Sequence, residues 1–279
     1  METTKITFIG AGNMASSIIG GLIQHGWLNQ NIVVADCDQN KLEQMHQQYQ
    51  VQTNANNREA VANAHVIILA VKPQFMRSVT EEITDQVQQN QPLIISIAAG
   101  IQTGHIQNWL GDCSIIRTMP NTPALVQTGA TGLYANAAVT DTQKQIADTI
   151  LGAVGMTAWV DSESDLDLVT ALSGSGPAYF FLFMEAMENA AQALGLNPDV
   201  AHQLTLQTAL GSAKMAATSD NDLPILRKNV TSPGGTTEKA ILSFENSQLR
   251  QTVHTAVEAA FNRSIELSQQ FGDEKWVIR

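Results

Sequence analysis

Short apolar runs alternate with amphipathic stretches along the first half of the chain. We predict strands, in chain order, at residues 6–9, 32–35, 66–71, 93–97, 114–117, 131–135 and 157–160. We predict helices between the earlier strands at residues 14–25, 41–49 and 75–87. Because the strands are apolar at successive positions and alternate with helices, we expect an α/β domain with a mostly parallel sheet covered on both faces.

The pattern changes after Asp165, where no further strand is predicted. Helices are predicted, in chain order, from Gly176-Pro177 to Leu194, from Asn197-Pro198 to Ala217, after Gly235, and from Asn246 to Gln270, with Gly272 as the stop. The prolines suit the first turns of their helices, and the glycines suit their ends. We therefore predict two domains: an α/β domain over residues 1–164 and an all-α domain over 165–279.

The helix predicted at 177–194 is apolar nearly all round. Every residue from Ala178 to Met184 is apolar, and the polar positions of the helix form one narrow stripe. A helix of this kind must be buried. An interface between subunits would bury it, and so would the core of a single subunit; we favour the interface, because a small helical layer has little interior of its own.

Charge and composition exclude several classes of function. The chain has 279 residues, with 26 acidic side chains against 15 basic ones, and no long basic stretch. We therefore expect neither a nucleic-acid partner nor an anionic membrane surface. The uninterrupted apolar runs fall short of the ~20 residues that span a bilayer. The six histidines show neither H-x-H nor H-E-x-x-H spacing, so we predict no metal site.

Cysteine usage and the N-terminus indicate a cytoplasmic protein. Cys37 and Cys113 are far apart in sequence and form no C-x-x-C motif. We interpret them as two buried small apolar residues in a reducing compartment. The segment Met1–Ile6 has no basic region followed by a long apolar one, so we predict no signal peptide.

The segment Gly10-Ala11-Gly12-Asn13-Met14-Ala15 follows the first strand and opens the first helix. This is a G-x-G-x-x-A motif: the first glycine permits a tight turn and the second lets the backbone approach a pyrophosphate. The start of the helix presents free N–H groups to the phosphates. In this context the motif predicts a Rossmann-like dinucleotide-binding domain.

Asp36, at the end of the second strand, bears on the choice of cofactor. An acidic side chain at this position accepts from the ribose 2′-hydroxyl of NAD, whereas NADP sites prefer arginine or small polar residues. Residues 34–40 contain no arginine or lysine. If the carboxylate faces the ribose, we expect NADH to be preferred.

Two further loops end predicted strands. Ala70-Val71-Lys72-Pro73 and Ile97-Ala98-Ala99-Gly100 both lie where ligands bind to parallel sheets, at the carboxyl ends of the strands. Their small residues allow backbone contact with a flat ring. The Lys72 ammonium group is as well placed to bind a phosphate as to face solvent, and both interpretations stay open.

Three more motifs have both a structural and a functional interpretation. Two prolines make the segment Met119-Pro120-Asn121-Thr122-Pro123 rigid, so it is either a connector or a fixed side of the site next to the reacting ring. Ser173–Tyr179 suits a Ser/Gly loop that caps a helix or binds a ligand through hydroxyls such as that of Ser175. Ser232–Thr237, with two glycines before a helix, suits capping or a backbone cradle for a carboxylate.

These motifs, in this order, resemble the pyrroline-5-carboxylate reductase family over nearly the whole chain, and the segment Leu226–Thr237 matches the family's signature, which is highly specific. The resemblance implies a cytoplasmic enzyme of proline biosynthesis that reduces 1-pyrroline-5-carboxylate to L-proline with NADPH or NADH. It also implies a helical domain that interlocks in a homodimer, and assembly into decamers in several members.

Carried over to this chain, the family's cofactor contacts fall on Gly10, Ala11, Gly12, Asn13, Met14, Asn57, Ala70, Val71, Lys72, Pro73, Ile97, Ala98 and Ala99. Its substrate contacts fall on Ser175, Ser232, Gly234, Gly235, Thr236 and Thr237, with Thr237 bonded to the ring nitrogen. Ala15 and Asp36 depart from the usual pattern. Asp36 is the more serious departure, because many members carry a neutral polar residue there and prefer NADPH.

Two other functions stay open at this point. A β-hydroxyacid dehydrogenase of similar plan needs a lysine on a helix of its second domain, and Lys214 is the candidate. That interpretation leaves the segment Ser232–Thr237 unexplained. A nucleotide-binding sensor without catalysis is the other alternative.

Overall fold

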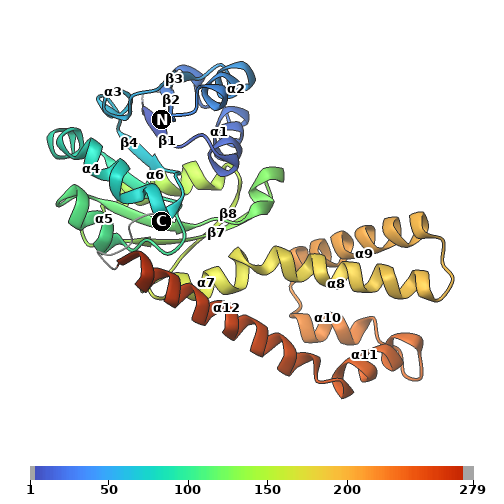
Figure 1. Cartoon of the computed structure of the whole chain (residues 1–279). Coiled ribbons are helices and arrows are strands. Elements are labelled where there is room, and N and C mark those ends of the chain that lie inside the picture. The colour runs from blue at the N-terminus through green and yellow to red at the C-terminus, as the bar shows by residue number, and fades with distance from the viewer. Residues whose placement is uncertain (1–3, 273–279) are drawn as a thin grey trace. The chain divides into compact units, whose positions relative to one another are not determined.

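An eight-stranded sheet forms the centre of the first structural unit (Figure 1). The structure, a computed structural model, describes residues 4–272. The strands are β1 (Ile6–Ile9), β2 (Ile32–Ala35), β3 (Gln52–Asn54), β4 (Val66–Leu69), β5 (Leu93–Ser96), β6 (Ile115–Met119), β7 (Gly129–Ala135) and β8 (Gly155–Trp159). Their spatial order is β3-β2-β1-β4-β5-β6-β7-β8. Only the β6–β7 pairing is antiparallel, which confirms the mostly parallel sheet.

Helices and short turns connect these strands. They are α1 (Asn13–Gln24), α2 (Gln39–Tyr49), α3 (Asn57–Val61), α4 (Pro73–Asn90), α5 (Thr103–Leu110), α6 (Asp141–Gly152), α7 (Asp165–Val169), the 3₁₀ turns η1 (Asn29–Asn31) and η2 (Thr122–Val126), and the π-turn η3 (Thr170–Gly174). The three helices predicted here correspond to α1, α2 and α4. Strand β3 escaped prediction because its residues are polar and lie at the sheet edge.

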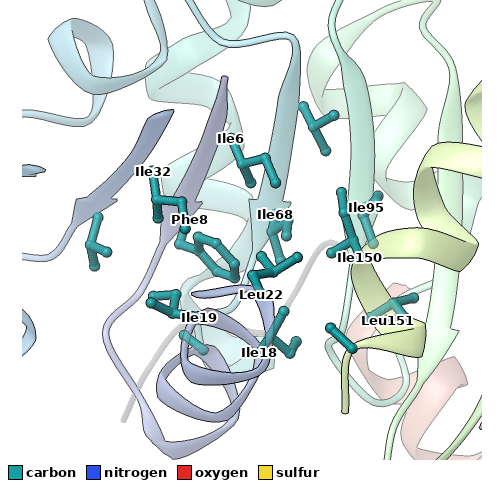
Figure 2. Close-up of a cluster of buried hydrophobic side chains, with 14 of the residues drawn as sticks. Ile6, Phe8, Ile18, Ile19, Leu22, Ile32, Ile68, Ile95, Ile150 and Leu151 are labelled. Atoms are coloured by element: carbon teal, nitrogen blue, oxygen red, sulfur yellow. The ribbon is translucent and has the colours of Figure 1, made fainter. Parts of the chain in front are cut away.

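Alternate side chains of the central strands build two cores, one on each face of the sheet. Phe8 and Ile68 belong to the cluster that packs against α1 and α6 (Figure 2). Ile9, Ile67 and Leu69 belong to the cluster that packs against α4 and α5. Because successive side chains of a strand point to opposite faces, a continuous apolar run is what a sheet covered on both sides requires.

Phe8→Ala is expected to destabilise the sheet unit by about 3–5 kcal/mol, because Phe8 is fully buried and its loss leaves a cavity. Phe75→Ala is the matched control, since Phe75 is 45% exposed and its truncation is expected to cost about 0.5 kcal/mol or less. Denaturant unfolding of both variants measures the difference. Equal losses would contradict this assignment of the core.

The second unit, residues 176–259, is entirely helical, as predicted. It contains α8 (Gly176–Ala193), α9 (Pro198–Thr218), α10 (Leu223–Asn229), α11 (Thr236–Asn246) and the first part of α12 (Leu249–Gly272). Helices α8 and α9 lie side by side (Figure 1). Asn197 caps α9 by accepting from the N–H groups of Asp199 and Val200, so the Asn-Pro start predicted for this helix is present.

The two units divide at Ser175 and again at Ala259, whereas we predicted a boundary between residues 164 and 165. Residues 165–175 and 260–272 pack with the sheet unit. A buried ionic cluster accounts for this packing: Arg117 on β6 lies 3.3 Å from Glu163 and 3.9 Å from Asp167. Asp167 in turn accepts a 2.6 Å hydrogen bond from Ser264 of α12. These contacts are distant in sequence.

Helix α8 exposes much of its apolar surface within the single chain. Phe180, Phe181 and Leu182 are 71%, 62% and 67% exposed. The described residues of one chain therefore leave these apolar side chains uncovered. The continuous helix Asp165–Ala193 is also long and apolar enough to cross a membrane by length and composition, a property that it shares with buried helices of soluble proteins.

Candidate active site

The sheet register aligns the carboxyl ends of the four strands that precede the predicted cofactor-binding segments. Ile9 pairs with Ala35 on one side and with Leu69 on the other, and Leu69 pairs with Ser96. The residues that follow these strand ends therefore meet at the carboxyl edge of the sheet. This edge is where parallel α/β sheets bind ligands.

The glycine turn fits a dinucleotide. Gly10 has φ +104°, and a Cβ there would lie 2.6 Å from the carbonyl oxygen of Ala70, so the turn after β1 sits directly against the loop after β4. Gly12 is the N-cap of α1 and makes no side-chain capping bond. The N–H groups of Asn13 and Met14 therefore begin the helix without a side-chain cap, as phosphate binding requires.

Replacing Gly10 and Gly12 one at a time distinguishes an effect on fold stability from an effect on cofactor affinity. Gly10→Ala is expected to cost about 2 kcal/mol or more of stability and to weaken NAD(P)H binding, because the new Cβ is strained and meets Ala70. Gly12→Ala is expected to cost no more than about 1 kcal/mol, since no atom lies within 4 Å of the new Cβ.

Gly12→Ala nonetheless places a methyl group where we predict that the pyrophosphate approaches, so we expect it to weaken NAD(P)H binding. Thermal unfolding without cofactor and fluorescence titration with NAD(P)H measure the two effects. Wild-type cofactor affinity in Gly12→Ala would contradict the placement of the pyrophosphate.

Asp36 is held in place by the backbone around it. One carboxylate oxygen accepts from the Ala11 N–H at 2.8 Å, and the other accepts from the Asp38 N–H at 2.9 Å. The Lys41 ammonium, on the first turn of α2, lies 3.9 Å from the same carboxylate. Lys41 follows directly after residues 34–40, which contain no basic side chain. The region around Asp36 therefore contains a cation as well as a carboxylate.

The other two predicted binding loops also lie at the carboxyl edge of the sheet. Ala70 donates to the carbonyl of Ile9, and the exposed Lys72 precedes Pro73, the first residue of α4. After β5, Ile97 donates to Leu69, and the loop continues through the buried Ala98 to the exposed Ala99.

Asn57 opens α3. Its carboxamide donates to the carboxylate of Glu82 on α4 at 2.8 Å. The amide nitrogen is thus engaged within the protein, and the amide oxygen remains as the group that can accept from a cofactor hydroxyl.

A histidine cap holds the chain just after the Ile97–Ala99 loop. The Gln102 N–H donates to Nδ1 of His105 at 3.3 Å and so helps to start α5. Burial lowers the pKa of His105, opposed by the nearby Glu163 carboxylate. The ring is therefore neutral at pH 7 and can accept this hydrogen bond.

The segment Ser232–Thr237 forms a tight turn that opens α11. Gly234 has φ +73°, Gly235 is the N-cap, and no side-chain bond caps the helix. The N–H groups of Thr236 and Thr237 therefore begin the helix uncapped, as a carboxylate cradle requires. The N–H of Gly234, however, donates to the Glu238 carboxylate at 2.8 Å.

The helix start predicted at Gly176 is confirmed by α8, but the loop predicted just before it, at residues 173–175, is wrong. Residues 170–174 form the π-turn η3, which follows α7 directly, and Ser175 is the single residue between η3 and α8. The Ser175 N–H donates to the carbonyl of Thr170 at 2.8 Å, so it is not a free helix-terminal donor. The Ser and Gly composition suggested a loop, but tertiary contacts hold this segment in a helix.

Asn121 is the residue whose role the sequence left undecided. Its amide nitrogen donates to the carbonyl of Ser173 at 3.0 Å, and its amide oxygen accepts from the Ala130 N–H at 2.9 Å. The segment 119–123 is therefore joined to the π-turn. The flanking prolines were the only signal in the sequence.

The two cysteines differ in environment. Cys113 is buried, as predicted, and burial raises the pKa of its thiol to about 11. Cys37 is exposed, next to Asp36, so the prediction that both are buried is wrong.

Comparison with known proteins decides the family. Residues 163–267 match the family model for pyrroline-5-carboxylate reductase dimerisation, and residues 5–100 match that for NADP oxidoreductase, coenzyme F420-dependent. The chain is 47% identical to the pyrroline-5-carboxylate reductase of Pseudomonas aeruginosa over 98% of this chain and 100% of that protein. This chain belongs to the pyrroline-5-carboxylate reductase family.

Solved structures of the family have the same fold. The enzyme from Coxiella burnetii is 47% identical, with a TM-score of 0.93 over 95% of this chain and 99% of that one. The enzyme from Plasmodium falciparum, solved with NADP bound, is 31% identical, with a TM-score of 0.84 over 96% and 99%. The resemblance and the two-part α/β and helical fold are thus confirmed, as is the class of NAD(P)H-dependent oxidoreductases. The dimerisation match also supports an oligomer.

Proposed function

We propose that this chain reduces 1-pyrroline-5-carboxylate to L-proline with NAD(P)H, the last step of proline synthesis. The observation that carries the proposal is 47% identity, over nearly the full length, to a pyrroline-5-carboxylate reductase. The Lys214 alternative is weaker, because Lys214 is exposed on α9 and the turn at residues 232–237 would have no role.

The cofactor side of the reaction rests on the glycine turn. The uncapped N–H groups of Asn13 and Met14 suit the pyrophosphate, and Asp36 suits the adenosine ribose. When bound, the dihydronicotinamide supplies the hydride. The loops at 70–73 and 97–99, on the neighbouring strands, offer small side chains and backbone for the ring to rest on.

The substrate side rests on the turn before α11. The N–H groups of Thr236 and Thr237 suit the substrate carboxylate, and Ser232, Gly234, Gly235 and Ser175 complete the proposed contacts. The protonated C=N bond is already electrophilic, so the protein need not supply a strong acid. Thr237, which is partly buried, orients the ring nitrogen, and holding the imine carbon in reach of the hydride lowers the barrier by several kcal/mol.

We further propose that the chain works in the cytoplasm as a homodimer, with decamers as a higher assembly. The dimerisation match over residues 163–267 and the exposed apolar face of α8 support a partner subunit. The same partner, rather than a membrane, would then cover this helix. Light scattering on the full chain tests the dimer.

Steady-state kinetics with 1-pyrroline-5-carboxylate, using NADH and NADPH in turn, test the activity. Proline formation matched by cofactor oxidation is expected. A β-hydroxyacid with NAD(P)⁺ serves as the comparison substrate and is expected not to react. Turnover of the hydroxyacid alone would favour the dehydrogenase, and cofactor binding without turnover of either substrate would favour the sensor.

A further inference from the structure

The π-turn η3 is a rare feature at a conspicuous place. It interrupts the α-helical pattern at Thr170–Gly174, immediately before Ser175, one of the proposed substrate contacts. Single π-turns within α-helices are uncommon and occur frequently at functional sites. We therefore expect specific tertiary contacts to be the physical reason for a π-turn at this position.

Asn121 supplies one. This side chain is 9% exposed, and both ends of its carboxamide are bonded: Nδ2 to the carbonyl of Ser173, and Oδ1 to the N–H of Ala130 on β7. Asn121 precedes η2, but its side chain does not cap that turn. The carboxamide thus joins the sheet to the π-turn through one donor and one acceptor bond.

A second contact supports the same arrangement. A Cβ on Gly174 would lie 2.7 Å from the terminal methyl of Met119, so the backbone of the π-turn packs directly against the end of β6. Pro120 limits the backbone between Met119 and Asn121. The turn is therefore held at two adjacent points by one short segment.

We propose that Asn121 is a positioning residue: by holding the carbonyl of Ser173, it keeps the π-turn in shape and so sets the place of the Ser175 hydroxyl for the substrate. The inference rests on the proposed reductase function and on Ser175 as a substrate contact. In this proposal Asn121 acts on the substrate site through Ser173 and not by binding the substrate or the cofactor itself.

Asn121→Asp tests this role. The carboxylate still accepts from Ala130 but cannot donate to Ser173, so we expect the KM for 1-pyrroline-5-carboxylate at pH 7.5 to rise about tenfold, with NAD(P)H affinity unchanged. Protonated aspartic acid regains a donor. The KM ratio of variant to wild type is therefore expected to fall toward one as the pH is lowered through the carboxyl pKa.

Asn136→Asp is the matched control. Asn136 makes the same two bonds, accepting from the Ile115 N–H at 3.1 Å and donating to the carbonyl of Cys113 at 3.0 Å, beside the first residue of β6 rather than its last. A comparable loss of Tm with an unchanged KM is expected. If Asn136→Asp raised KM as much as Asn121→Asp, or if Asn121→Asp left KM unchanged, the positioning role would be overturned.

Asn121→Ser provides the second variant should the Asp protein fail to fold. Its hydroxyl is too short to join both partners and does not titrate, so the same rise in KM is expected without recovery at low pH. Ser175→Ala combined with either Asn121 variant is expected to raise KM no further than Ser175→Ala alone. Fully additive effects would overturn the coupling to Ser175, whereas a wild-type protein inactive on 1-pyrroline-5-carboxylate would instead refute the proposed function.

Discussion

Thr237→Ala is expected to lower kcat/KM for 1-pyrroline-5-carboxylate about 10- to 100-fold, the range for losing a hydrogen bond to a charged group. Thr237 is the second residue of α11 and lies in a turn whose helix has no side-chain cap. Removing its hydroxyl takes away the partner of the ring nitrogen but leaves the backbone cradle intact. Affinity for NAD(P)H is expected to stay near wild type.

Two variants serve as controls for Thr237→Ala. Thr237→Ser keeps a hydroxyl on the same carbon and is expected to retain most of the activity. Thr218→Ala removes a threonine hydroxyl from the same unit, where it donates to the carbonyl of Lys214 within its own helix, and is expected to leave kcat/KM unchanged. Wild-type turnover in Thr237→Ala would remove Thr237 from the site.

Asp36→Ser is expected to shift the cofactor preference from NADH toward NADPH. A carboxylate about 4 Å from a 2′-phosphate charge costs about 1 kcal/mol in water and about 4 kcal/mol near a protein surface. The shift in the NADPH/NADH ratio of kcat/KM is therefore expected to lie between about fivefold and about a thousandfold. Lys41, 3.9 Å from Asp36, would be released to meet the phosphate.

Matched variants isolate the effect of the charge. Asp38→Ser removes a neighbouring carboxylate but keeps a good N-cap for α2, where Asp38 now accepts from the Asn40 N–H, so the ratio is expected to move little. Lys41→Met is expected to lower the use of NADPH selectively. An unchanged ratio in Asp36→Ser would show that the carboxylate does not face the ribose.

The central strands were predictable from sequence because burial on both faces requires continuous apolar runs, and glycine or proline punctuates their ends. Strands β1 and β2 begin and end at the predicted residues. The glycine turn was equally predictable from sequence, because only glycine fits there: Gly10 has φ +104° and approaches Ala70 too closely for a side chain.

Local sequence patterns could not predict three other features: the π-turn, the Lys41–Asp36 pair and the division of the chain into units. Each depends on groups that are distant in sequence or on side-chain reach: Asn121 meets Ser173, and Asp167 meets Ser264. A run such as Ser173–Gly176 has the composition of a loop, and local preference alone assigns it to one. The bond from Asn121 and the packing of Met119 shift the balance to a helix.

By itself, the sequence determined the class of the fold, the position of the dinucleotide turn and the family, because these depend on local periodicity and on residues adjacent in the chain. Only the tertiary structure decided how Asp36 is held, that the apolar side chains of α8 are exposed in one chain, and that a π-turn precedes Ser175. These features arise from hydrogen bonds and burial between segments 5 to 97 residues apart, which no local pattern encodes.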